Sequence, residues 1–81
     1  MKVVVRLFAG ARDAVGQAEV EIEIPENSSI RLLRQSLLEH YPALDSLLPH
    51  TMFAINADYA TDETPVPTDA EIACIPPVSG G

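Results

Sequence analysis

The chain has 81 residues, enough for one domain, because chains of this size bury only about 60% of their unfolded surface. Five basic and twelve acidic side chains give a formal net charge of -7. This charge argues against nucleic acid or an anionic membrane as a partner and favours proteins. The hydrophobic fraction of 47% and the charged fraction of 21% are typical of a folded globular domain.

Side chains that could carry chemistry are few. Cys74 is the single cysteine, so the chain cannot form an internal disulfide or a thiolate metal cluster, and a reducing cytoplasm is the expected compartment. Besides this cysteine, the chain has only two histidines, His40 and His50, as typical side chains for nucleophilic catalysis or metal binding. We expect no metal site. The N-terminal run of valines ends at Arg6, so we expect it to be too short for the apolar region of a signal peptide or for a membrane span.

Two strands are predicted near the N-terminus. Residues 2–8 are β-branched and apolar, and their alternation places Phe8 on the face opposite the core. Residues 19–24 alternate glutamates with apolar residues, which predicts a half-buried strand at an edge of the sheet. Residues 9–17 contain two glycines and are expected to interrupt the pattern.

One amphipathic helix is predicted over residues 30–40. Its apolar residues recur at helical spacing, the polar residues 27–29 offer N-cap oxygens, and Pro42 follows its end. Arg31 and Arg34 fall on its polar side, which indicates solvated or interface arginines. Residues 43–48 are expected to form a helical turn or a loop.

Three further strands follow. Residues 51–56 and 59–61 are predicted to pair through a turn at 56–58, and residues 71–75 form the last strand. In that last strand Cys74 faces inward, so core packing is expected rather than a persulfide-carrying role. Ile75 faces the opposite way.

This order of elements predicts an α+β fold, with one main helix packed across a mixed sheet. If the first and last strands are central neighbours, Phe8 and Ile75 lie close together on the outer face. We expect a domain over residues 1–75, followed by a flexible tail over residues 76–81.

The tail has an unusual composition for a chain end. It consists of Pro76, Pro77, Val78, Ser79, Gly80 and Gly81. Extended, these residues span roughly 20 Å. The prolines stiffen the root, and the glycines keep the tip slim, so a partner could enclose the tip and reach the terminal carboxyl group. The alternative is a frayed end without function.

The tail and three internal segments resemble the small subunits of molybdopterin synthase, a family of ubiquitin-like sulfur carriers with the β-grasp fold. The resemblance covers essentially the whole chain, and the ending Pro-Pro-Val-Ser-Gly-Gly is its most discriminating part. The internal segments are residues 5–12, 56–59 and 68–72. Ala70 replaces the glycine that is usual in the last turn, which affects local conformation only.

The resemblance implies a sulfur carrier whose reactive atom lies at Gly81. An activating enzyme of the E1 type would use ATP and magnesium to adenylate Gly81, and a sulfur-donating enzyme would then leave a thiocarboxylate. The tail would insert into the large synthase subunit and donate sulfur to cyclic pyranopterin monophosphate, forming the dithiolene of molybdopterin. The chain itself would bind no cofactor, and the catalytic side chains would belong to the large subunit, in what we expect to be a heterotetramer.

The resemblance also implies an interface with the large subunit at Phe8, Tyr59 and Ile75. Two other functions stay open at this point. One is a sulfur carrier for thiamine thiazole synthesis, against which the Pro-Pro-Val-Ser context argues. The other is a ubiquitin-like protein modifier or an interaction module without sulfur chemistry.

Overall fold

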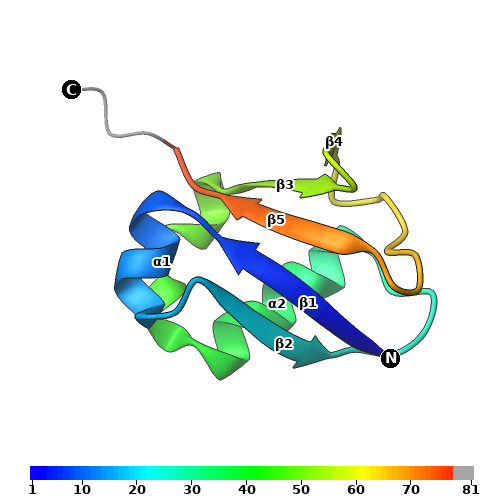
Figure 1. Ribbon diagram of the computed structural model, residues 1–81, viewed down its shortest axis with the longest axis horizontal. Helices are drawn as coiled ribbons and strands as arrows, with labels where there is room; N and C mark the ends of the chain where they lie inside the picture. Colours follow the sequence, from blue (N-terminus) through cyan, green and yellow to red (C-terminus); the bar gives the residue numbers. More distant parts are fainter. Residues whose placement is uncertain (78–81) are drawn as a thin grey trace.

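A computed structural model describes residues 1–77 as two layers, a mixed sheet and a set of helices on one of its faces (Figure 1). The sheet has five strands in the order β2-β1-β5-β3-β4. The strands are β1 (Lys2–Leu7), β2 (Glu19–Glu23), β3 (Met52–Ile55), β4 (Asp58–Ala60) and β5 (Glu71–Ile75). This arrangement confirms the predicted α+β fold.

The first and last strands are central neighbours, as predicted. β1 and β5 run parallel, whereas β1–β2, β3–β5 and β3–β4 are antiparallel pairs. β2 lies at one edge, in agreement with the predicted alternation, and the short strand β4 lies at the other. Because β1 and β5 run parallel, their C-terminal ends meet at the same end of the sheet.

The main helix is α2 (Ile30–His40), with the bounds that the periodicity predicted. It lies behind the sheet in the view of Figure 1 and buries Ile30, Leu33 and Leu37. Two 3-10 helices follow, η1 (Pro42–Leu44) and η2 (Leu48–His50).

The strand pattern is interrupted over residues 9–17, as expected, but most of this segment forms a short helix, α1 (Ala9–Val15), which was not predicted. Gly16 ends this helix in the left-handed conformation, with φ 82°. Only Ala11 is buried within α1, which contacts η1. One buried position leaves no visible helical period, so the sequence signal for α1 is weak.

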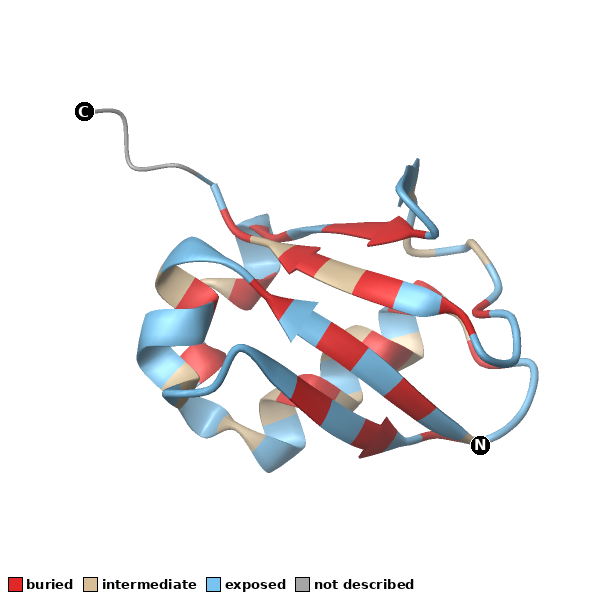
Figure 2. Ribbon diagram, viewed as in Figure 1, coloured by how far each residue is buried: buried red, intermediate tan, exposed pale blue. Residues whose placement is uncertain are grey.

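The core fills the space between the helices and the inner face of the sheet. In Figure 2 buried and exposed residues alternate along β1, as expected of a strand with one covered face. The largest side chains with almost no exposure include Phe53 from β3, Leu7 from β1 and Ile72 from β5. Cys74 is also fully buried here, which confirms its predicted place in the core.

The N-terminus of α2 is satisfied by the backbone of a distant loop. Ser29 is the N-cap residue but makes no side-chain capping bond. Instead, Ile30 and Arg31 donate their N–H groups to the carbonyls of Thr64 and Asp62, each at 3.0 Å. The loop between β4 and β5 therefore closes over the start of α2.

Arg34 is a structural residue, and its expected role as a solvated or interface side chain is wrong. It donates to the carbonyls of Leu48 and Thr51, the latter at 2.9 Å, and to the Asp62 carboxylate at 2.9 Å. Its guanidinium carbon lies 4.9 Å from the centre of the Phe53 ring. Arg34 thus ties α2 to the start of β3 and to the loop after β4.

None of the helices formed by residues 1–77 has both the length and the apolar character needed to cross a bilayer.

Candidate functional site

The outer face of the sheet brings Phe8 and Ile75 together, as the strand order predicted. Leu7 is in register with Cys74 across the parallel β1–β5 pair, so Phe8 and Ile75 are the next residues along these two strands. The Phe8 N–H donates to the carbonyl of Cys74 at 3.3 Å. Phe8 is 40% exposed and Ile75 is half-buried.

Tyr59 shares this face but does not adjoin the other two predicted residues. It pairs with Ala54 of β3, which in turn pairs with Ala73 of β5. Tyr59 is therefore two strands away from β5, at the edge of the sheet. It is the most exposed of the large hydrophobic side chains within residues 1–77, at 69%.

Met52 continues the row that Phe8 and Ile75 begin, and the sequence analysis missed it. It lies directly opposite Ile75 across the β3–β5 pair and is 53% exposed. The signal was available, because inward positions for Phe53 and Ile55 place Met52 on the outer face by alternation. We use the name apolar patch for four residues: Phe8, Met52, Tyr59 and Ile75.

The hairpin that carries Tyr59 turns through two residues in the left-handed region. Asn56 has φ 49° and Ala57 has φ 73°, the combination that a type I′ turn requires. The Asn56 N–H donates to the Glu71 carbonyl at 2.9 Å, and the Glu71 N–H donates to the Asn56 side chain at 3.0 Å. These two bonds fasten the turn to the start of β5.

The tail leaves the domain from the end of β5, beside the apolar patch. Pro76 is buried and Pro77 is exposed. Val78, Ser79, Gly80 and Gly81, which carry most of the predicted site, lie outside the described residues. The division into a domain and a flexible tail stays a prediction.

Cys74 is poorly suited to carry sulfur. Burial raises the pKa of its thiol to about 11, an effect that the charge of Arg34 opposes. A thiol with this pKa is protonated at neutral pH, and the thiolate is the nucleophilic form. Within residues 1–77, no group of three or more His, Cys, Asp or Glu side chains is placed to hold a metal ion.

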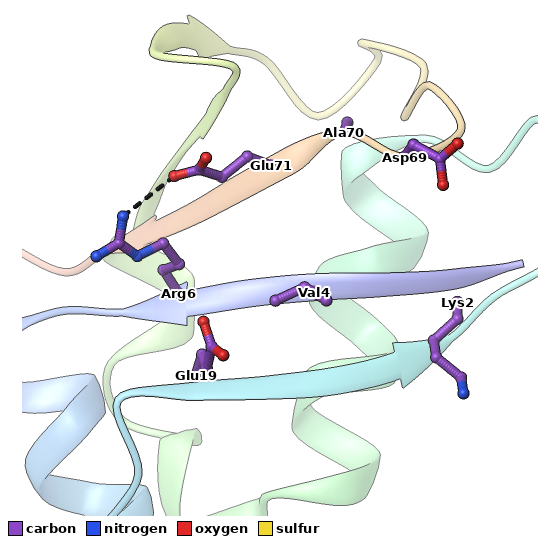
Figure 3. A pocket seen from close by; sticks show the side chains of 7 residues that line it. All are labelled: Lys2, Val4, Arg6, Glu19, Asp69, Ala70 and Glu71. Atoms are coloured by element: carbon purple, nitrogen blue, oxygen red, sulfur yellow. Dashed lines mark hydrogen bonds and ion pairs between the residues drawn. The ribbon is translucent and has the colours of Figure 1, made fainter.

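The other half of the outer face is charged and contains an open hollow of about 440 Å³ (Figure 3). The hollow lies over β1, β2 and the start of β5, away from the end of β5 where the tail leaves. Arg6 joins the two halves: it forms an ion pair with Glu71 at 3.2 Å, and its guanidinium carbon lies 5.8 Å from the centre of the Phe8 ring.

The turn before β5 accommodates Ala70 at the position where the family that the sequence resembles usually has glycine. The left-handed conformation falls on Asp69, with φ 61°, whereas Ala70 is not among the residues with positive φ. Ala70 is 8% exposed and belongs to the core. An alanine therefore fits this position without backbone strain.

Comparison with known proteins places the chain among small carrier proteins. Residues 5–81 match the ThiS family. The molybdopterin synthase sulfur carrier subunit of Caenorhabditis elegans is 38% identical over 79 residues, covering 95% of this chain and 94% of that protein.

Solved structures share the fold. The crystal structure of SAMP1 from Haloferax volcanii superposes with a TM-score of 0.87 at 25% identity, with both chains fully covered. The complex of subunits 1 and 2 of molybdopterin-converting factor from Helicobacter pylori contains a chain with a TM-score of 0.70 at 26% identity, again with full coverage of both.

Proposed function

Because the chain belongs to the ThiS family, we propose that it is the sulfur carrier subunit of a molybdopterin synthase, acting in molybdenum cofactor biosynthesis. The observation that carries the proposal is the apolar patch at the root of a Gly-Gly tail. Phe8 and Met52 flank Ile75, and the tail starts at the next residue. A partner that covers the patch can receive the tail in its own active site.

The chemistry begins with activation of Gly81. An α-carboxyl group has a pKa of about 3.5, so it is an anion at neutral pH and a poor acceptor for a sulfur nucleophile. An activating enzyme of the E1 type uses ATP and magnesium to convert the carboxylate into a reactive acyl adenylate. The carboxylate attacks the α-phosphate, pyrophosphate leaves, and a sulfur nucleophile supplied by a second enzyme then displaces AMP to form the thiocarboxylate.

The large synthase subunit is the next partner. The apolar patch docks on it, the tail carries the thiocarboxylate to bound cyclic pyranopterin monophosphate, and two such transfers form the dithiolene. The complex of subunits 1 and 2 supports a large-subunit partner. The chain contributes position and the sulfur atom, whereas the catalytic side chains and any heterotetramer contacts belong to the large subunit.

The chain's own residues support this division of roles. Cys74, the only thiol, is buried and protonated at neutral pH, so it does not compete with Gly81 for sulfur. A free cysteine also fits a reducing compartment, and we propose the cytoplasm as the site of action. Nucleic acid and membrane are not proposed as partners, because the net charge is -7.

The test is sulfur loading of the purified chain. With activating enzyme, ATP and sulfide, the intact mass is expected to rise by one oxygen-to-sulfur exchange, located in the C-terminal peptide. Deletion of Gly81 removes this product, and Cys74→Ala keeps it. A sulfur load on Cys74, or an unchanged mass of the wild-type chain, contradicts the proposal.

A protein modifier is the second candidate, and the likeness to SAMP1, a small archaeal modifier protein, supports it. The same activation would then lead to an isopeptide bond between Gly81 and a lysine of another protein. Digestion and mass spectrometry of the reaction products distinguish the two outcomes, because a modifier leaves a branched peptide and a sulfur carrier leaves a thiocarboxylate. Loading alone does not exclude a thiamine pathway, so transfer to cyclic pyranopterin monophosphate completes the test.

A further inference from the structure

We propose that the charged half of the outer sheet face is a second part of the docking surface, and that it receives a basic region of the large subunit. This inference rests on the function proposed above. It adds that the contacting surface of the partner is basic and that the partner extends from the apolar patch over the charged half of the sheet face.

Carboxylates dominate this half of the face. They come from the edge strand β2 and from the start of β5, and the register places Glu21 and Glu71 on either side of Val4. Two basic side chains, Lys2 and Arg6, lie among them. We use the name acidic zone for five residues: Glu19, Glu21, Glu23, Asp69 and Glu71.

Both basic side chains already have partners within the acidic zone. Lys2 lies 3.6 Å from the Glu21 carboxylate, and Arg6 lies 3.2 Å from the Glu71 carboxylate. Among residues 1–77, Glu19 and Asp69 take part in none of the ion pairs. The zone therefore keeps an excess of negative charge that a basic partner surface can neutralise.

The hollow in this zone can receive one long basic side chain, because the two basic side chains in its lining, Lys2 and Arg6, are already paired with carboxylates. Val4 is 38% exposed among the lining residues, and the side chains of Glu19 and Glu71 lie on the Arg6 side of it, with Glu71 paired to Arg6 (Figure 3). An arginine or lysine of the partner can rest its aliphatic stem on Val4 and direct its charged group to these carboxylates. The exposed valine distinguishes this hollow from a simple acidic surface.

The zone adjoins the apolar patch on the same sheet face. Arg6 links the two, since it pairs with Glu71 of the zone and its guanidinium lies over the Phe8 ring of the patch. One flat partner surface can therefore cover the patch with apolar side chains and the zone with basic ones. Because the two halves differ in chemistry, they allow only one orientation, which directs the tail consistently.

The expected consequence is electrostatic steering of association with the large subunit. Charge reversal in the zone, Glu21→Lys, is compared with Glu39→Lys on an exposed position of α2, which changes the net charge by the same amount. At about 50 mM salt, Glu21→Lys is expected to slow association about five-fold, and at about 500 mM salt the difference shrinks, because screening shortens the range of the charges. Glu39→Lys is expected to stay within about two-fold of wild type.

Stopped-flow measurement with the purified large subunit decides the question, with thermal melting to check that each variant is folded. Glu21→Gln, which only removes a charge, is expected to give an intermediate rate. Equal slowing by Glu21→Lys and Glu39→Lys would mean that only net charge matters, and no slowing by either would mean that the zone stays outside the interface. Both results overturn this inference but leave the proposed function intact, provided that wild type binds. A wild-type chain that neither binds nor donates sulfur overturns both.

Discussion

Met52 lies directly opposite Ile75 across the antiparallel β3–β5 pair, so the exposed row beside the tail root runs over three strands. Phe8, the residue that follows β1, forms its other end. These three residues come from the beginning, middle and end of the chain. The row extends the surface expected from Phe8 and Ile75 toward Tyr59.

Met52→Glu is expected to weaken binding of the large subunit by more than about ten-fold. The substitution would bury a charge in an apolar contact, and Met52 is 53% exposed in the free chain, so the fold tolerates it. Isothermal titration calorimetry measures the effect. Gln35→Glu, which adds the same charge at an exposed position of α2, serves as the control. Unchanged affinity of the Met52 variant would exclude this residue from the interface.

Arg34→Met is expected to lower the free energy of unfolding by about 1–3 kcal/mol, because it leaves the Leu48 and Thr51 carbonyls and the Asp62 carboxylate without their donor. Arg31→Met is the matched control on the same helix. Its pair with Glu63 is exposed on both sides, and pairs of this kind contribute about 0–1 kcal/mol. Urea denaturation of both variants tests the contrast, and equal losses would contradict the structural role of Arg34.

Ala57→Gly is expected to stabilise the chain by about 0.5–1 kcal/mol. Ala57 has φ 73°, a conformation that glycine adopts without the steric cost of a Cβ atom. The matched control is Ala14→Gly within α1, where glycine is expected to cost about 0.5–1 kcal/mol. The melting temperature should therefore rise for Ala57→Gly and fall for Ala14→Gly.

The stability that depends on Cys74 is expected to fall in alkaline solution. Folding raises the pKa of the thiol from 9.0 to about 11, so the folded state holds its proton more tightly than the unfolded state. The resulting stabilisation is complete below about pH 9 and is lost as the pH rises through 11. Each pKa unit corresponds to about 1.4 kcal/mol.

Cys74→Ala isolates this contribution from the other groups that titrate in the same range. At neutral pH the variant is expected to be less stable by about 1–2 kcal/mol, because a buried sulfur is lost from the core. Urea denaturation between pH 8 and pH 11 measures the free energy of unfolding of both proteins. The difference between wild type and variant should become smaller as the pH rises. A constant gap would show that the thiol titrates alike in both states.

The sequence by itself determined those elements whose pattern repeats along the chain. Three turns of apolar periodicity predicted α2 with its observed bounds, and strict alternation predicted the buried and exposed faces of β1, β2 and β5. Such patterns are local, because one face of each element must be apolar to meet the core. The tail, too, was visible in the sequence, as a composition that cannot continue a sheet.

The tertiary structure decided which distant residues meet. It added α1, whose single buried residue produces no period, and it turned Arg34 from a surface charge into a link between α2, β3 and the loop after β4. It also placed Met52 between Ile75 and the strand of Tyr59, and gathered the acidic zone from β2 and the start of β5. These relationships depend on strand order and register, which bring together side chains far apart in the chain and leave no local periodic signal in the sequence.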